Sequence, residues 1–93
     1  MNTAQIKEMI IKTLGITAEN LADTMDGTME KKIRPLVNTL SWDDVAGVLK
    51  SATRWQMRNA IDSGDSNMPG EQFAKVIVTR VLVMEIDAHF GVR

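Results

Sequence analysis

Residues 41–64 read SWDDVAGVLKSATRWQMRNAIDSG, the longest stretch of the chain with helical spacing and start and stop signals at its two ends. Ser41 is a preferred N-cap, and Asp43 and Asp44 follow it at the positive end of the expected helix dipole. Apolar residues recur with helical spacing at Val45, Val48, Leu49, Ala52, Trp55, Ala60 and Ile61. Gly64 can end a helix in the left-handed conformation. The pattern predicts one amphipathic helix over 41–64, around which the rest of the chain is organised.

A row of basic residues follows from the same spacing. Lys50, Arg54 and Arg58 stand four residues apart, so they fall in one line along this helix, with Trp55 beside them. One interpretation is a contact face for phosphate or for an acidic protein surface. The other is an ordinary solvated helix face, whose long stems cover apolar neighbours. The sequence leaves both open.

The N-terminal part of the chain predicts two further helices, over 4–14 and 18–26. Thr3 is the expected cap of the first helix, and Gly15 its expected stop. Ile16 and Leu21 occupy the two positions of a hydrophobic staple at the start of the second helix. Gly27 is the expected terminator of that helix.

Pro35 predicts a break in the following segment, because proline disfavours the α conformation at the residue before it and removes a donor. A short helix is expected from Pro35 to about residue 40. Lys31, Lys32 and Arg34 would then lie at an accessible bend, where they could contact an anion or a partner. A solvated turn is the alternative use of these residues.

The last element, over 70–89, contains the run VIVTRVLVMEI at 76–86, whose β-branched content would also suit a buried strand. A helix is preferred because the segment is long and Pro69 favours a helix start. A helix that is apolar on nearly all sides is buried, either at the centre of the domain or in self-association. The predicted fold is all-α, a small bundle of four to five helices in one domain over 1–93. The alternative is an α+β fold with 75–86 as a strand.

Composition limits the classes of function. The 93 residues carry a net charge of −1, yet six basic and only two acidic residues fall within 31–60. Such asymmetry suits a charged partner or self-association, whereas a non-specific nucleic-acid binder is normally basic overall. The chain has no cysteine, which excludes disulfides and fits a cytoplasmic location. No apolar run approaches the ~20 residues that span a bilayer, so no membrane contact is expected.

Catalytic and metal-binding motifs are missing from the sequence. His89 is the only histidine, and no Gly-rich phosphate loop, HExxH or GxSxG motif is present. The acidic loop at 62–70 fails as a calcium loop, because Phe73 stands where the twelfth-position Glu is required. We therefore expect a non-enzymatic protein without cofactor, metal or catalytic residues.

Two functions remain as hypotheses. The first is a small regulatory, adaptor or inhibitor protein, of the accessory type found in phages and mobile elements, that binds another protein and forms a homo-oligomer. Its partner is expected to be acidic, and its contact residues are predicted to be Lys50, Arg54, Trp55, Arg58, Lys31, Lys32 and Arg34.

The second hypothesis is a helix-turn-helix DNA-binding regulator that uses residues 42–61. WDDVAGVL would be its first helix and ATRWQMRNAI its recognition helix, which would offer Thr53, Gln56, Arg58 and Asn59 to base edges. Lys50 stands where this motif usually has glycine, and Gln56 and Asn59 stand where it usually has apolar residues.

Overall fold

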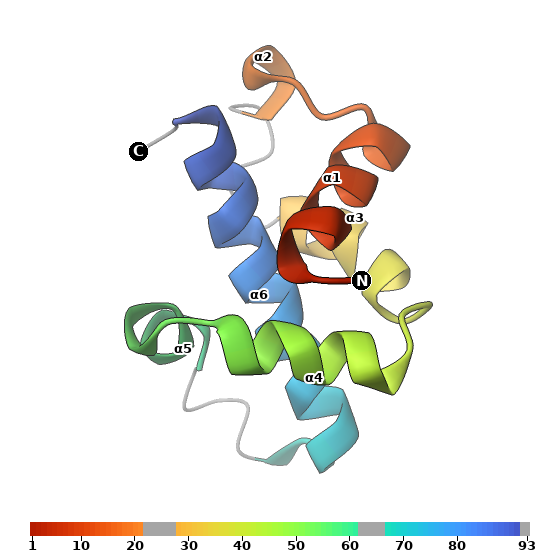
Figure 1. The fold of residues 1–93 in the computed structure, drawn as a ribbon, viewed down its shortest axis with the longest axis vertical. Helices are drawn as coiled ribbons and strands as arrows, with labels where there is room; N and C mark the ends of the chain where they lie inside the picture. The colour runs from red at the N-terminus through yellow and green to blue at the C-terminus, as the bar shows by residue number, and fades with distance from the viewer. Residues whose placement is uncertain (22–27, 62–66, 92–93) are drawn as a thin grey trace.

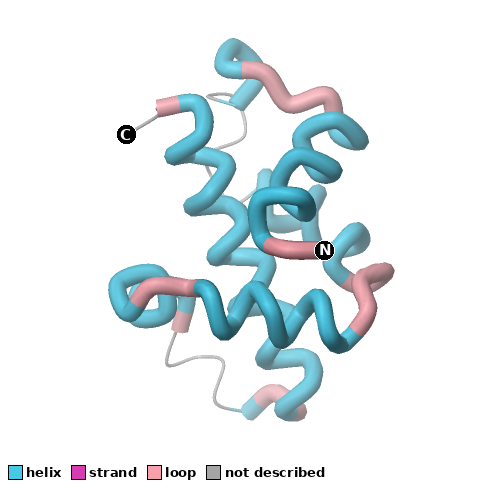
Figure 2. The backbone as a smooth tube through the Cα atoms, in the orientation of Figure 1, coloured by secondary structure: helices cyan, strands magenta, loops and turns pink. Residues whose placement is uncertain are grey.

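The computed structural model describes residues 1–21, 28–61 and 67–91, and every regular element in these ranges is a helix (Figures 1 and 2). The elements are α1 Thr3–Leu14, α2 Ala18–Leu21, α3 Thr28–Val37, α4 Trp42–Ser51, α5 Arg54–Ala60 and α6 Gly70–Phe90. The all-α prediction is confirmed. The strand alternative for 75–86 is wrong, because these residues lie inside α6. The described residues form six helices rather than four to five, since 41–61 divides in two.

Helix α6 is the centre of the bundle (Figure 1). Helices α1, α3, α4 and α5 all pack against it. Its buried residues point in several directions and are Val76, Ile77, Val78, Thr79, Val81, Leu82 and Ile86. Partners on several sides explain why this helix is apolar nearly all round. The sequence predicted that the apolar surface of this helix is buried either in the core or in self-association. In the structure this surface packs in the core.

Helix α6 begins and ends close to the predicted positions. It starts at Gly70, directly after Pro69, and ends at Phe90. Gly91 follows with φ 71°, the left-handed conformation that glycine adopts without strain. None of the helices in the described ranges is both long enough and apolar enough to cross a membrane.

Helix α1 is capped by Asn2, so the prediction that Thr3 is the cap is wrong. The Asn2 side chain accepts from the Gln5 backbone N–H at 2.8 Å, and the Gln5 side chain accepts from the Asn2 N–H at 2.8 Å. This reciprocal pair satisfies two donors of the first turn. Gly15 ends the helix with φ 63°, as predicted.

The staple residues Ile16 and Leu21 are both buried, at 7% and 1% exposure. Helix α2 is described only as far as Leu21. The predicted extension to residue 26 and the stop at Gly27 lie outside the described residues.

Helix α3 contradicts the predicted break at Pro35, because it runs from Thr28 to Val37 with the proline inside. Met29, Ile33 and Val37 recur every four residues and are buried. Pro35 lies on the exposed side of the same helix. The carbonyl that loses its usual donor belongs to Lys31, which is also exposed, so water can hydrate it.

Residues 41–61 do not form the single helix that the spacing predicts. Ser41 caps α4 as expected, accepting from the Asp44 N–H at 3.2 Å. The chain then turns extended at Ala52, with φ −64° and ψ 140°, and at Thr53, with φ −74° and ψ 162°. A second capping box, between Thr53 and Gln56, starts α5. The predicted stop at Gly64 lies outside the described residues.

Candidate functional site

The division of 41–61 changes which side chains reach the surface. Trp55 belongs to the apolar set of the predicted helix, yet in α5 it is 63% exposed, the most exposed large apolar side chain described. Ala60 is buried instead, and Met57 packs partly against the core. Trp42 at the start of α4 is also 52% exposed. The helical spacing was therefore wrong about the direction of Trp55.

The predicted basic row lies on two helices rather than one. Lys50 is in the last turn of α4, while Arg54 and Arg58 lie one turn apart on α5, with Trp55 next to Arg54. All four side chains are exposed, and we call them together the α5 face. Within the described ranges, no ion pair includes a member of the α5 face.

The other three predicted contact residues lie on α3. Lys31 and Lys32 are exposed, and Arg34 is half-buried. They belong to a helix and not to the bend that was predicted. The structure thus divides the predicted contact set between α3 and the α4–α5 corner.

Arg80 joins these two parts of the molecule through α6. Its Nε donates to Glu30 Oε1 on α3 at 3.0 Å, and its Nη1 donates to the carbonyl oxygen of Ala60 at the end of α5 at 2.9 Å. Both helices are therefore held to the same guanidinium. This residue has no recognisable signal in the sequence, because its partners are 50 and 20 positions away.

Three of the four side chains predicted to read DNA bases make hydrogen bonds inside the protein. Thr53 accepts from the Gln56 N–H at 3.0 Å, and the Gln56 side chain accepts from the Thr53 N–H at 2.9 Å. Gln56 Nε2 also donates to Glu85 Oε1 on α6 at 2.9 Å. Asn59 Nδ2 donates to the carbonyl oxygen of Trp55 at 2.8 Å. Reading a base with these groups would require breaking bonds that shape α5.

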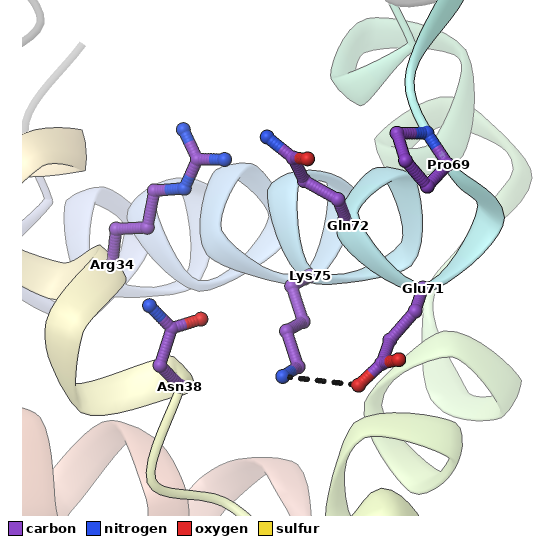
Figure 3. A pocket seen from close by; sticks show the side chains of 6 residues that line it. All are labelled: Arg34, Asn38, Pro69, Glu71, Gln72 and Lys75. Carbon is purple, nitrogen blue, oxygen red and sulfur yellow. Dashed lines mark ion pairs between the residues drawn. The ribbon is translucent and has the colours of Figure 1, made fainter.

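A hollow of about 360 Å³ lies between α3 and the beginning of α6 (Figure 3). Its lining is mostly polar and consists of Arg34, Asn38, Pro69, Glu71, Gln72 and Lys75. Lys75 Nζ lies 3.5 Å from Glu71 Oε1. Of these residues only Arg34 belongs to the contact set predicted from the sequence, because the two sides of the hollow come from distant segments.

A second hollow, of about 410 Å³, lies beside the first and shares Glu71 with it. Its other lining residues are Trp42, Gly70 and Ala74. The exposed indole of Trp42 thus stands next to a polar hollow. Together the two hollows combine charged donors with a flat apolar surface.

Two carboxyl groups have displaced pKa values, and both lie outside these surfaces. The pKa of Asp44 is lowered, mainly because the N-terminal ammonium of Met1 donates a hydrogen bond to Oδ1 at 2.6 Å. The pKa of Asp87 on α6 is raised by burial. Within the described ranges, no three acidic, histidine or cysteine side chains gather closely enough to hold a metal ion.

Comparison with known proteins gives no relative: no family model, curated protein or solved structure matches the chain. The function is therefore inferred from the α5 face and the two hollows.

Proposed function

We propose that this protein is a non-enzymatic regulator, adaptor or inhibitor that binds an acidic protein surface through the α5 face. The observation that carries the proposal is Trp55, which is 63% exposed on α5 beside Arg54. Tryptophan and arginine are the residues most enriched among those that dominate binding energy at protein interfaces. Trp55 is exposed, and the neighbouring basic residues form no ion pair with an acid in the described ranges. This combination suits binding to an acidic protein surface.

The charge of the chain supports a protein partner over a nucleic acid. The α5 face is basic, but the protein as a whole carries −1. A basic patch on a nearly neutral protein attracts an acidic patch and sets the orientation of the encounter. A protein that relies on many phosphate contacts is usually basic overall.

DNA binding remains a second candidate, and one feature favours it. Helices α4 and α5 are joined by only Ala52 and Thr53, and Figure 1 shows α5 nearly end-on where α4 runs across the view. A short connection between two strongly angled helices is typical of a helix-turn-helix unit. The hydrogen bonds of Thr53, Gln56 and Asn59 weigh against it. A DNA-bound form would lose affinity steeply between low and moderate salt, whereas flat salt dependence would exclude this candidate.

Homo-oligomer formation and a cytoplasmic location also remain predictions. The first now rests on the charge asymmetry alone, because the apolar surface of α6 is used in the core. The second rests on the lack of cysteine in the sequence.

The proposal is tested by affinity capture from nuclease-treated lysate of the native cells, with tagged wild-type and variant proteins. Trp55→Ala should weaken capture of the partner by about 2 kcal/mol, or roughly thirtyfold, because a central aromatic contact is lost. Arg58→Glu should weaken it further, since it places an acid against an acidic surface. Binding of the purified partner by calorimetry gives the fold-changes.

Lys12→Glu is the matched control for Arg58→Glu. Lys12 and Arg58 are both exposed and both lie in the last turn of their helices. The two substitutions therefore change the net charge and the helix-dipole interaction in the same way. The proposal predicts loss only with Arg58→Glu, and equal binding by the two variants would remove the α5 face as the contact.

A further inference from the structure

The α3–α6 hollow brings together four side chains that donate hydrogen bonds. Arg34 and Asn38 come from the end of the α3 segment, and Gln72 and Lys75 come from the first turns of α6 (Figure 3). Two of these groups are cations and two are carboxamides. A cluster of this composition suits an oxyanion, because a carboxylate or a phosphate accepts several charged and neutral hydrogen bonds at once.

Arg34 is the strongest reason to regard the hollow as a binding site. Its side chain is half-buried, yet none of the ion pairs among the described residues includes it. In Figure 3 its guanidinium and the amide of Gln72 lie on one side of α6, and Asn38 and the ammonium of Lys75 lie on the other side. A guanidinium presents its donors in a planar fork that matches the two oxygens of a carboxylate or phosphate.

Glu71 is the one acidic residue among the described residues that line the hollow, and its ion pair with Lys75 is weak. Glu71 pairs with Lys75 at 3.5 Å along the same helix, and its side chain is 72% exposed. Exposed pairs of this kind contribute little, because water screens them and two flexible side chains must be ordered. An entering oxyanion can therefore take the place of the Glu71 carboxylate at Lys75 with little loss.

The second hollow indicates what the anion is attached to. It shares Glu71 with the first and is bounded by Trp42, whose indole is 52% exposed, and by the small residues Gly70 and Ala74. Small residues beside an accessible indole leave room for a flat group to stack. The volume of each hollow lies in the lower part of the range for ligand pockets, about 300–1,000 Å³.

We propose that the two hollows form one site for a small organic oxyanion, a carboxylate or phosphate joined to a flat apolar group. The oxyanion binds between Arg34 and Lys75, and the flat group stacks on Trp42. This site is separate from the α5 face, because Trp42 begins α4 and Lys50 lies at its other end. It does not rest on the protein-binding proposal.

The test is a titration of isotope-labelled protein followed by NMR, with three probes. Adenosine monophosphate and N-acetyltryptophan each join a flat group to an oxyanion, one a phosphate and one a carboxylate, while inorganic phosphate lacks the flat group. At least one of the first two should shift the Trp42 indole signal together with the backbone amides of Asn38, Gln72 and Lys75. The tighter of the two is the probe for the variants. Inorganic phosphate should bind more weakly than this tighter probe.

Arg34→Gln and Lys75→Gln should each weaken binding of the tighter probe by about tenfold or more, since each removes a charged donor. Arg58→Gln is the matched control: it removes one charge from the α5 face and should leave probe affinity unchanged, while circular dichroism checks the helicity of every variant. The proposal fails if no probe moves the Trp42 signal, if inorganic phosphate binds as tightly as the larger probes, or if Arg34→Gln binds like wild type. These outcomes are independent of the lysate experiment, whose variants leave the hollow intact.

Discussion

Helix α3 contains a proline and continues, whereas residues 41–61 contain none and divide into two helices. In α3 the buried residues Met29, Ile33 and Val37 keep a regular four-residue spacing through the proline. In the second region, Val45 and Val48 are buried, but the next fully buried residue is Ala60. Ala60 follows Val48 by twelve residues, which places it about 120° from Val48 around a continuous helix.

The difference teaches that packing against α6 favours both outcomes: in α3 it outweighs the local preference of proline, and in 41–61 it acts together with the capping box of Thr53 and Gln56. In one continuous helix Trp55 and Ala60 would point about 140° apart, because each residue turns the helix by about 100°, so the two could not both face α6. A break at Ala52 and Thr53 lets both short helices face α6, and it leaves Trp55 in solvent. In α3 no such conflict exists, so the buried stripe outweighs the unfavourable proline.

Ile33→Ala should have the largest effect, because it interrupts the stripe that holds α3 together. Ile33 is fully buried, and removing such a side chain typically costs about 2–5 kcal/mol of unfolding free energy. Urea denaturation measures the change, and Ile33→Val, at about 0.5–1.5 kcal/mol, serves if the alanine variant does not fold. Ile61→Ala is the control, since Ile61 is 48% exposed and its loss should stay within about 0.5 kcal/mol. Equal destabilisation at the two positions would contradict the role of the stripe.

Pro35→Ala should stabilise the protein, by about 1–2 kcal/mol, because it restores a backbone donor to the exposed side of α3 and removes the ring clash. Part of the gain is offset by the greater freedom of the unfolded chain. The midpoint of thermal unfolding should rise, while Lys32→Ala on the same exposed side should leave it nearly unchanged. A lower unfolding midpoint for Pro35→Ala would mean that the proline stabilises the folded protein.

Thr53→Ala should have the smallest effect of the three, a loss of about 1 kcal/mol, because it removes the cap of α5. The Gln56 N–H would lose the hydroxyl that it now reaches at 3.0 Å. If packing sets the break, backbone chemical shifts should still show Ala52 as extended in the variant. A continuous helix across 52–53 would instead show that the capping box alone divides the region. Thr13→Ala, at an exposed position inside α1, is the control for loss of a threonine.

The functional surfaces could be predicted only in part. The sequence showed which basic residues were present, and Lys31, Lys32, Lys50, Arg54 and Arg58 are indeed exposed. It could not show how they are grouped, because that depends on the break after α4. The α3–α6 hollow could not be foreseen at all, since Arg34 and Lys75 line the same hollow only through the packing of α3 on α6.

Local chemistry was enough to determine the elements whose signals act within a few residues. Apolar spacing predicted the helical class, segment length and Pro69 predicted the position of α6, and Ser41 and Gly15 marked helix ends through hydrogen bonds and backbone freedom. The tertiary structure decided the continuity of α3 and the exposure of Trp55, whereas the break at Ala52 and Thr53 also has a local contribution from the capping box of Thr53 and Gln56. Each of these outcomes depends on which side chains α6 buries, and in α3 the free energy of that burial exceeds the local preference of proline that opposes it.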